Sequence, residues 1–206
     1  MKALLLHTPK GGSGKSTLAR ELAVAATLAG RRVALVDLDP QGSTTGWYGR
    51  RAAAEPVLLA APDNRPDLAA AEAAGVDLVV IDTPPARPAF LPALIAFADA
   101  VLVPCRPSPD DLLAAAPIAG SLAKHGAWAF VMCQAPTKSR LAQGAVRQLA
   151  ALGKLAPVSI GFRADFPAAA VDGMAAVEFP ETKAAGEIMQ LRSYAFTLMG
   201  WTDGPA

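Results

Sequence analysis

The sequence is poor in cysteine and in long apolar runs, and each shortage excludes a class of protein. Its two cysteines, Cys105 and Cys133, lie far apart in apolar stretches, and no C-x-x-C pair occurs. A zinc site or a thioredoxin-like pair is therefore excluded, and we expect two buried free thiols suited to a reducing cytoplasm. The apolar run before His7 is too short for a signal peptide or a membrane span.

Charge is also sparse, with 19 basic residues against 18 acidic ones and a net charge of +1. This balance gives no overall nucleic-acid signature and leaves only the option of a local basic patch. Apolar residues are abundant instead, at 52% of 206 residues, and many of them are alanine. Such a chain can form a core, and we expect residues 1–206 to form a single domain.

Short runs rich in valine and leucine alternate with helical stretches along the chain. The runs are continuous, which is typical of parallel strands buried on both faces. We expect strands over 3–7, 33–37, 76–82, 99–104 and 127–133, with a weak one near 158–160. Helices are expected over 16–29, 66–74, 88–97, 109–124, 139–151 and 181–199. This order predicts an α/β fold with a doubly wound, mostly parallel sheet flanked by helices.

The stretch HTPKGGSGKST, residues 7–17, lies between the first expected strand and the first expected helix. A phosphate-binding loop with the pattern G-x-x-x-x-G-K-[ST] requires this context, although Pro9 stands where its first glycine belongs. The remaining glycines allow the backbone to approach phosphates, Lys15 can reach the β- and γ-phosphates, and Ser16 can ligate Mg²⁺. The predicted nucleotide-binding residues are Gly11, Gly12, Ser13, Gly14, Lys15, Ser16 and Thr17.

Three aspartates follow expected strands. Asp37 and Asp39 come at the end of the strand over 33–37, and Asp82 ends the strand over 76–82. A strand-end aspartate can be a helix N-cap or part of a solvated turn. Beside a phosphate loop, however, carboxylates at this edge of a parallel sheet are natural partners of Mg²⁺. The predicted metal-site residues are Ser16, Asp37 and Asp82.

Four motifs, PKGGSGKST, ALVDLDPQGSTTGW, VIDTPP and VPCRPSPDDL, together resemble the ParA/MinD group of deviant Walker A ATPases. They are most similar to small ParA-type (ParF-like) partition ATPases, over roughly residues 1–195. The resemblance implies a P-loop NTPase fold, bound ATP or ADP with Mg²⁺, slow hydrolysis and an ATP-sandwich homodimer. It also implies that Lys10 reaches the partner's phosphates, that Asp39 orients the lytic water and that Asp37 supports the metal site. The predicted catalytic residues are thus Lys10, Lys15 and Asp39, although from the residues alone Lys10 is equally well a solvated cation.

The resemblance further implies non-specific DNA binding, a ParB-type adaptor that stimulates hydrolysis, and a cytoplasmic, nucleoid-associated location. Phosphate contacts of this kind need exposed basic side chains. A row of basic residues on a helix is also typical of a solvated face. The candidate DNA-binding residues are Lys138, Arg140, Arg147, Arg163 and Lys183.

Three other functions stay open. A MinD-like membrane-associated positioning ATPase needs a basic amphipathic tail, whereas the last expected helix is apolar at 188, 191, 195 and 198, which predicts packing onto the sheet. An iron protein or cluster carrier needs cysteines on loops near the dimer face or a C-x-x-C pair, and the sequence shows neither. An ATP-dependent small-molecule enzyme needs a substrate pocket, which the sequence does not identify. The cargo, the extension of dimers to filaments and the adenine contacts, expected in late loops, also stay open.

Overall fold

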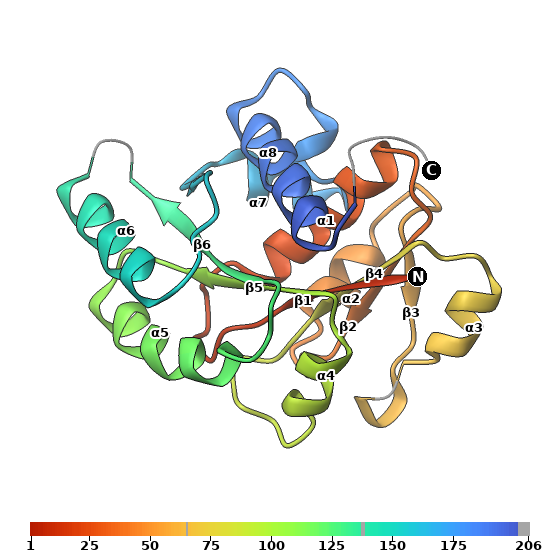
Figure 1. Ribbon diagram of the computed structural model, residues 1–206. Helices are drawn as coiled ribbons and strands as arrows, with labels where there is room; N and C mark the ends of the chain where they lie inside the picture. The colour runs from red at the N-terminus through yellow and green to blue at the C-terminus, as the bar shows by residue number, and fades with distance from the viewer. Residues whose placement is uncertain (65, 137–138, 202–206) are drawn as a thin grey trace.

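Seven strands form one sheet in the order β3-β2-β4-β1-β5-β6-β7, and every neighbouring pair is parallel. The computed structural model describes residues 1–64, 66–136 and 139–201. Helices cover both faces of the sheet (Figure 1). The predicted doubly wound fold is therefore confirmed. The strands are β1 (Lys2–Leu6), β2 (Val33–Asp37), β3 (Val57–Leu59), β4 (Leu78–Asp82), β5 (Ala100–Cys105), β6 (Trp128–Ala135) and β7 (Ile160–Gly161).

The helices follow the predicted order, and the structure adds short elements between them. Sequence patterns miss α2, β3 and α7 because each is short and contains, or lies beside, glycine or proline. Of these, β3 pairs with β2 and closes one edge of the sheet. The helices are α1 (Lys15–Leu28), α2 (Ser43–Tyr48), η1 (Pro62–Asn64), α3 (Leu68–Ala73), α4 (Leu91–Phe97), α5 (Pro109–Leu122), α6 (Arg140–Leu152), α7 (Asp165–Val171), η2 (Ala176–Glu178) and α8 (Lys183–Leu198).

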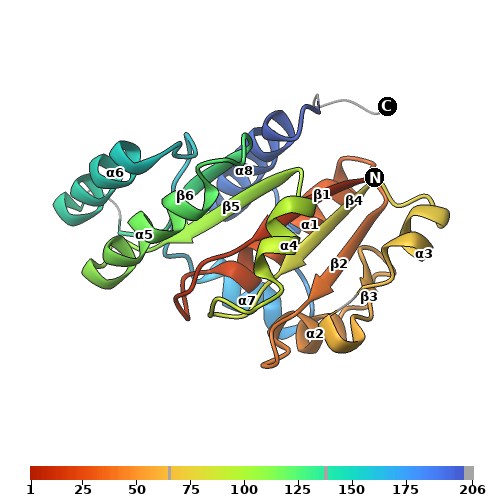
Figure 2. The ribbon, with the colours of Figure 1, turned by 60° about the horizontal axis from the view of Figure 1, so that its bottom comes forward.

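Alternate side chains of each strand enter two separate apolar layers. Leu4 and Leu6 of β1 join the layer under α1 and α8, and Leu5 joins the layer under α3, α4, α5 and α6. Figure 2 shows α4 and α5 in front of the sheet and α8 behind it. Ile188 and Leu191 of α8 are fully buried, which confirms that this helix packs onto the fold. Each such side chain stabilises the fold by about 1.5–3 kcal/mol.

Two further predictions concern burial. Cys105 and Cys133 are both buried free thiols, as expected. Burial raises the pKa of the Cys105 thiol to about 12, so it stays protonated and unreactive at neutral pH. Within the described residues, the structure has no helix with the length and apolar character needed to cross a membrane.

Candidate functional site

The loop between β1 and α1, residues 7–14, carries the predicted phosphate-binding motif. Gly12 and Gly14 have φ angles of 70° and 105°, in the left-handed region that glycine adopts without strain. Gly14 also caps α1, so the free N–H groups and the positive dipole end of this helix face the loop. A turn of this shape can hold an anion with backbone N–H groups.

Lys15 begins α1 and is held inside the loop. Its Nζ donates to the Lys10 carbonyl at 3.1 Å, and the Ser13 hydroxyl donates to the same oxygen at 3.2 Å. Lys15 is only 5% exposed, and burial lowers its pKa against the opposing effect of Asp82 and Asp39. A buried cation of this kind gains from phosphate oxygens, because charge-assisted hydrogen bonds are strong in a low dielectric.

Asp82 ends β4 beneath the loop, in register with Leu6 of β1 and Asp37 of β2. Its carboxylate is fully buried, and Thr44 of α2 donates to Oδ2 at 2.8 Å. Oδ1 has no hydrogen-bond partner within the described residues. Burial raises the pKa of Asp82 to about 6, while the hydroxyls of Ser16 and Thr44 act in the opposite direction.

This orphaned carboxylate oxygen beside the Ser16 hydroxyl suits Mg²⁺. The ion prefers oxygen ligands and, in phosphoryl-transfer sites, takes one or two carboxylates together with phosphates and water. Ser16 and Asp82 therefore fit the metal that the sequence predicts.

The two aspartates after β2 have different surroundings. Asp37 accepts the Thr45 N–H at 2.7 Å and the Thr45 hydroxyl at 3.0 Å through Oδ2, and the Asp39 N–H at 3.1 Å through Oδ1. Asp39 lines a cavity together with Lys15, and the Gln41 N–H fixes its Oδ1 at 3.0 Å. Asp37 thus anchors the start of α2, whereas Asp39 faces the phosphate loop.

The cavity between the loop and the segment after β2 has a volume of about 540 Å³, within the usual range of small-molecule sites. Ser13 is outside its lining because its side chain is fully buried, and Lys10 is half-buried nearby in the loop. The predicted residues that line it are Gly11, Gly12, Gly14, Lys15, Ser16, Thr17 and Asp39. Those that sequence reasoning misses are Arg20, Gln41, Ser43, Pro85 and Gln134.

Gln134 fixes the loop from the far side of the cavity. It has a φ of 52°, which is uncommon for a residue with a side chain. Its Nε2 donates to the Gly12 carbonyl at 2.8 Å. The end of β6 therefore holds a loop that is 122 residues away in the sequence. A glutamine inside an apolar run carries no motif, and this contact could not be found from the sequence.

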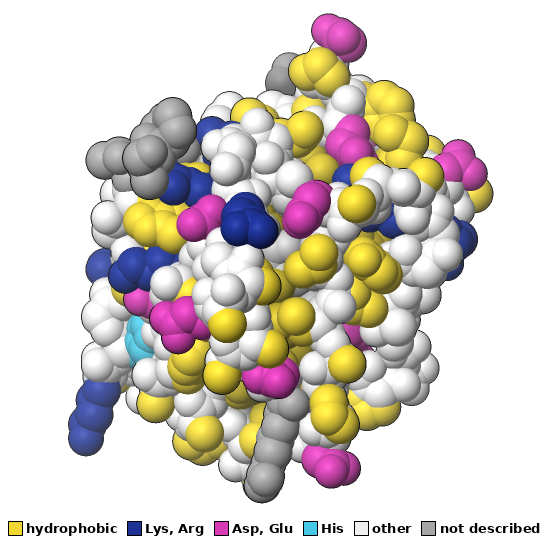
Figure 3. Space-filling view, turned by 90° about the vertical axis from the view of Figure 1, so that its right-hand side faces the viewer, with side chains coloured by type: hydrophobic (Ala, Val, Ile, Leu, Met, Phe, Trp, Pro, Cys, Tyr) yellow, Lys and Arg dark blue, Asp and Glu magenta, His cyan; other side chains and the backbone are white. Residues whose placement is uncertain are grey.

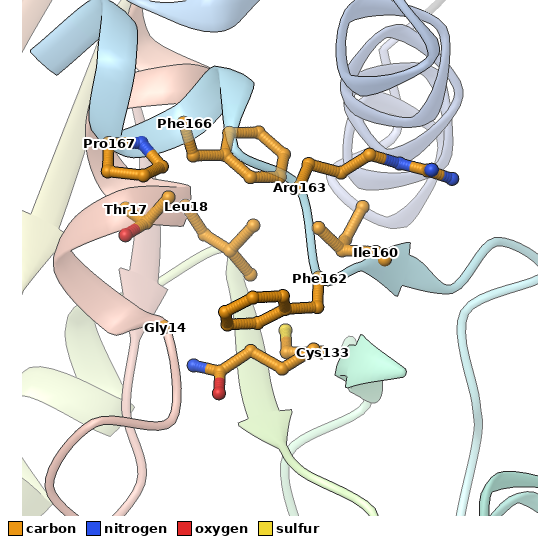
Figure 4. Close-up of a pocket in the computed structure, with 11 residues that line it drawn as sticks. Gly14, Thr17, Leu18, Cys133, Ile160, Phe162, Arg163, Phe166 and Pro167 are labelled. Atoms are coloured by element: carbon orange, nitrogen blue, oxygen red, sulfur yellow. The ribbon is translucent and has the colours of Figure 1, made fainter. Parts of the chain in front are cut away.

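A second cavity, of about 130 Å³, adjoins the first at Gly14, Thr17 and Gln134. It lies toward β7, whereas Asp39 and Ser43 of the first cavity follow β2, and these two strands are on opposite sides of β1 in the sheet. The ring of Phe162, which follows β7, points toward Leu18 of α1 with Cys133 beside it (Figure 4). This ring is 79% exposed although it is large and apolar. An exposed aromatic ring next to a phosphate loop offers a stacking surface for a planar base.

His7 lies under the loop and is held neutral. Its Nδ1 is 3.0 Å from the Thr83 Oγ1, and that hydroxyl donates to the Leu6 carbonyl at 2.9 Å. Because the Thr83 proton is committed to Leu6, we assign the imidazole proton to Nδ1, which donates to Thr83. Burial, together with the charges of Lys15 and Arg87, lowers the pKa of His7 to about 4.

The candidate DNA-binding residues lie on separate elements. Arg140 and Arg147 are exposed on α6, about two turns apart and so on one side of the helix. Arg147 and Arg163 line one groove of about 620 Å³, in which Arg163 forms an ion pair with Glu187 of α8. This ion pair occupies part of the hydrogen-bonding capacity of Arg163.

The remaining candidates are Lys183, which is exposed at the start of α8, and Lys138, which lies outside the described residues. On the face of the molecule beside β3 and α3, acidic and basic side chains are interspersed (Figure 3). This distribution agrees with the balanced charge of the chain.

Known proteins are similar to this chain in sequence over half of its length or more. Residues 4–160 match the family described as the CobQ/CobB/MinD/ParA nucleotide binding domain. Maintenance of carboxysome distribution protein A from Gloeobacter kilaueensis is 48% identical over 105 residues, which cover 50% of this chain and 48% of that protein. The chromosome-partitioning ATPase Soj of Thermus thermophilus is 35% identical over 135 residues, covering 50% and 54%. The chain thus spans about half the length of the curated relatives it matches.

Solved structures share the fold at low sequence identity. Cyanothece McdA without nucleotide has a TM-score of 0.71 and 21% identity, covering 94% of this chain and 99% of that one. MinD of Aquifex aeolicus, in complex with MinC, has a TM-score of 0.75 and 16% identity, covering 98% and 97%. These similarities confirm the P-loop fold that the sequence motifs predict.

Proposed function

Because this chain belongs to the CobQ/CobB/MinD/ParA family of nucleotide-binding domains, we propose that it is a ParA-type ATPase that positions a large cargo. In this proposal ATP drives the formation of a homodimer, the dimer binds DNA without sequence preference, and slow hydrolysis releases it. The observation that carries the proposal is the cavity in which Lys15 and the glycine loop face Asp39, with the orphaned oxygen of Asp82 buried beneath.

Lys15 and the loop N–H groups bind the β- and γ-phosphates, and the Lys15 ammonium exchanges the Lys10 carbonyl for phosphate oxygens. Ser16 and Asp82 would hold Mg²⁺, which offsets negative charge on the two phosphates when it is bound. Asp37 supports this site indirectly, because its three hydrogen bonds fix Asp39 and Thr45.

Asp39 orients the attacking water. Its carboxylate lines the cavity, and the Gln41 N–H fixes one of its oxygens, so the carboxylate has a defined direction. Hydrolysis of a phosphoanhydride depends mainly on position and charge, and a carboxylate that accepts a hydrogen bond from water supplies the position. The nucleotide base lies against Phe162, on the far side of Gly14 from Asp39.

Lys10 acts across the dimer. Its carbonyl belongs to the loop's internal hydrogen bonds, whereas none of the ion pairs within the described residues uses its ammonium. The side chain is therefore available to the phosphates of a second copy. Two copies that face each other through this loop enclose two nucleotides.

The names of the similar proteins support cargo positioning, since one concerns carboxysome distribution and another chromosome partitioning. We assign DNA contact to the exposed cations of α6 and of the start of α8, in line with the predicted residues. An adaptor of ParB type and a nucleoid-associated location complete the proposal. The family also includes CobQ and CobB, so an ATP-dependent small-molecule enzyme is the competing function.

The test compares ATP turnover and ATP binding in purified variants. Lys15→Ala should abolish ATP binding. Asp39→Ala should keep binding within about twofold and slow hydrolysis at least about tenfold, as expected for a group that positions the nucleophile. The control is Lys124→Ala, which removes an exposed cation at the end of α5 and should change neither.

Duplex DNA and candidate metabolites then distinguish the two functions. Wild-type turnover should be slow alone and should rise with duplex DNA plus an adaptor of ParB type. A rate that ignores DNA and rises with a small metabolite would refute cargo positioning and favour the enzyme. If Asp39→Ala hydrolyses ATP as fast as wild type, Asp39 does not orient the attacking water.

A further inference from the structure

Arg20 brings a guanidinium into the phosphate-loop cavity that no step of the proposed function uses. It lies on α1 one turn after Ser16, so the two side chains share one face of the helix. It lines the cavity together with Lys15, Asp39 and Ser43. Within the described part of the chain, no hydrogen bond or ion pair holds this guanidinium.

An aromatic ring holds Arg20 in place instead. The Arg20 Cζ lies 5.9 Å from the centroid of the Trp47 ring of α2, within reach of a cation–π interaction. Trp47 is fully buried, and its Nε1 donates to the Met174 carbonyl at 2.9 Å. The Arg51 Cζ lies 5.2 Å from the same ring, and Arg51 forms an ion pair with Glu178 at 3.0 Å. Trp47 is therefore a rigid support that leaves the N–H groups of Arg20 available.

Partial burial leaves the charge of Arg20 incompletely hydrated. Burial lowers its pKa, and the nearby charges of Glu21, Asp82 and Asp37 partly offset this effect. These carboxylates act at a distance, since no salt bridge joins them to Arg20 within the described residues. A half-buried guanidinium without a direct partner gains from an anion that enters the cavity, because a charge-assisted hydrogen bond replaces lost hydration.

The arrangement of the two cavities indicates which phosphate group of a bound nucleotide would contact Arg20. The Phe162 pocket lies on one side of Gly14 and Thr17, and Arg20, Asp39 and Ser43 lie in the cavity on the other. The base and the last phosphate form opposite ends of an extended nucleotide. A nucleotide with its base at Phe162 and its β-phosphate at Lys15 thus directs its γ-phosphate toward the part of the cavity that Lys15 and Arg20 both line.

We propose that Arg20 binds the terminal phosphate of a nucleoside triphosphate and so makes this site prefer ATP to ADP. This inference rests on the proposed function. Through its contact with Trp47, Arg20 also connects that phosphate to α2, whose Thr44 hydroxyl binds Asp82. ATP therefore changes the surroundings of Trp47, and ADP does not.

Calorimetric titration with ATPγS and with ADP, both with Mg²⁺, tests the preference. Arg20→Met keeps the length of the side chain and removes its charge. It should weaken ATPγS binding by about tenfold or more and ADP binding by less than about twofold, since a hydrogen bond between charged groups is worth about 1.5–3 kcal/mol. Arg20→Lys should recover part of the loss. The control is Arg32→Ala, which removes an exposed cation after α1 and should change neither affinity.

The results separate this inference from the function on which it rests. If Arg20→Met weakens both nucleotides equally, or neither, Arg20 does not sense the terminal phosphate. If the wild-type chain binds neither nucleotide, the proposed function fails first and this inference fails with it. Thermal unfolding of each variant shows whether it has folded, and Arg20→Lys serves as the test should Arg20→Met unfold.

Tryptophan emission gives a second readout. The emission of Trp47 is obtained as the difference between the chain and its Trp47→Phe variant, because Trp128 and Trp201 are also present. It should change with ATPγS and not with ADP, and Arg20→Met should lose the change. An equal response to both nucleotides would overturn the connection between the terminal phosphate and α2.

Discussion

Replacing Glu21 with glutamine should remove a pH-dependent component from the stability of the fold. Glu21 lies on α1 and is 3% exposed. Its carboxylate accepts the N–H groups of Ala176 at 2.8 Å and of Val177 at 3.0 Å, which joins α1 to η2. Burial nevertheless raises the pKa of Glu21 from its ordinary 4.5 to about 7, because two backbone donors do not replace the lost hydration of the charge.

The sign and size of the effect follow from this shift. The folded chain binds the Glu21 proton more tightly than the unfolded chain does. The stability that Glu21 contributes is therefore fully present below the unfolded pKa of 4.5 and is lost as the pH rises through about 7. One pKa unit corresponds to about 1.4 kcal/mol, so the whole loss is about 3.5 kcal/mol, and about 2.5 kcal/mol of it falls between about pH 5 and about pH 8.

Asp82, whose pKa burial raises to about 6, adds to this slope in the wild-type protein, whereas His7 opposes it. Burial lowers the pKa of His7 from 6.5 to about 4, so its contribution is present above 6.5 and is lost as the pH falls through about 4. Stability therefore rises with pH through His7 over much of the interval in which it falls through Glu21. The difference between wild type and a Glu21 variant cancels the contributions of Asp82 and His7.

Urea unfolding at a series of pH values measures this difference. The stability of wild type relative to Glu21→Gln should fall by about 2.5 kcal/mol from about pH 5 to about pH 8. The NH2 group of the glutamine amide faces one of the two backbone N–H donors and cannot accept its hydrogen bond. The variant therefore also loses about 1–3 kcal/mol of stability at every pH. Glu72→Gln, at an exposed position of α3, is the control and should give a flat difference. Parallel curves for wild type and Glu21→Gln would refute the reasoning.

Three further substitutions test other parts of the structure. Lys10→Ala should bind nucleotide normally and lose ATP-dependent dimers in light scattering, and dimers that persist would contradict the role of Lys10. Phe162→Ala should weaken ATP and ADP alike by about tenfold in titration, since stacking on a base is worth about 1–3 kcal/mol; unchanged affinity would exclude a base there. Gly173→Ala should lower stability by more than about 2 kcal/mol in thermal unfolding. Its φ is +68°, and a Cβ would lie 2.4 Å from the Arg51 nitrogen, so an unchanged melting temperature would contradict this packing.

The sheet could be predicted because each central strand is a continuous apolar run. The run at 78–82 is buried at every position, and β1, β2 and β5 show nearly the same pattern. β3 has only half-buried residues and lies at the sheet edge, where less apolar surface is buried and the sequence signal is weak. Residues 165–171 form α7 with Pro167 within its first turn, a combination that sequence patterns do not assign to a helix.

The candidate site also contains residues that could be predicted from the sequence and residues that could not. Lys15, Ser16 and Asp82 could be predicted because the loop and the strand end are local motifs with defined chemistry. Gln134 and Phe162 could not, since each reaches the phosphate loop from an element distant in sequence. Arg20 could not either, although it lies only one turn after Ser16 on α1. Arg20 in particular lies in an ordinary helical stretch of the sequence. Its position becomes informative only when α2 places Trp47 against it.

The proposed function gives Lys10 two roles, which belong to different parts of one residue. Its backbone carbonyl accepts hydrogen bonds from Ser13 and Lys15, so it helps to shape the loop before any phosphate binds. Its side chain takes part in none of the ion pairs within the described residues. Alanine at this position keeps the carbonyl and removes only the ammonium. Loss of dimerisation with intact nucleotide binding would therefore assign the partner contact to the side chain, because the loop itself is unchanged.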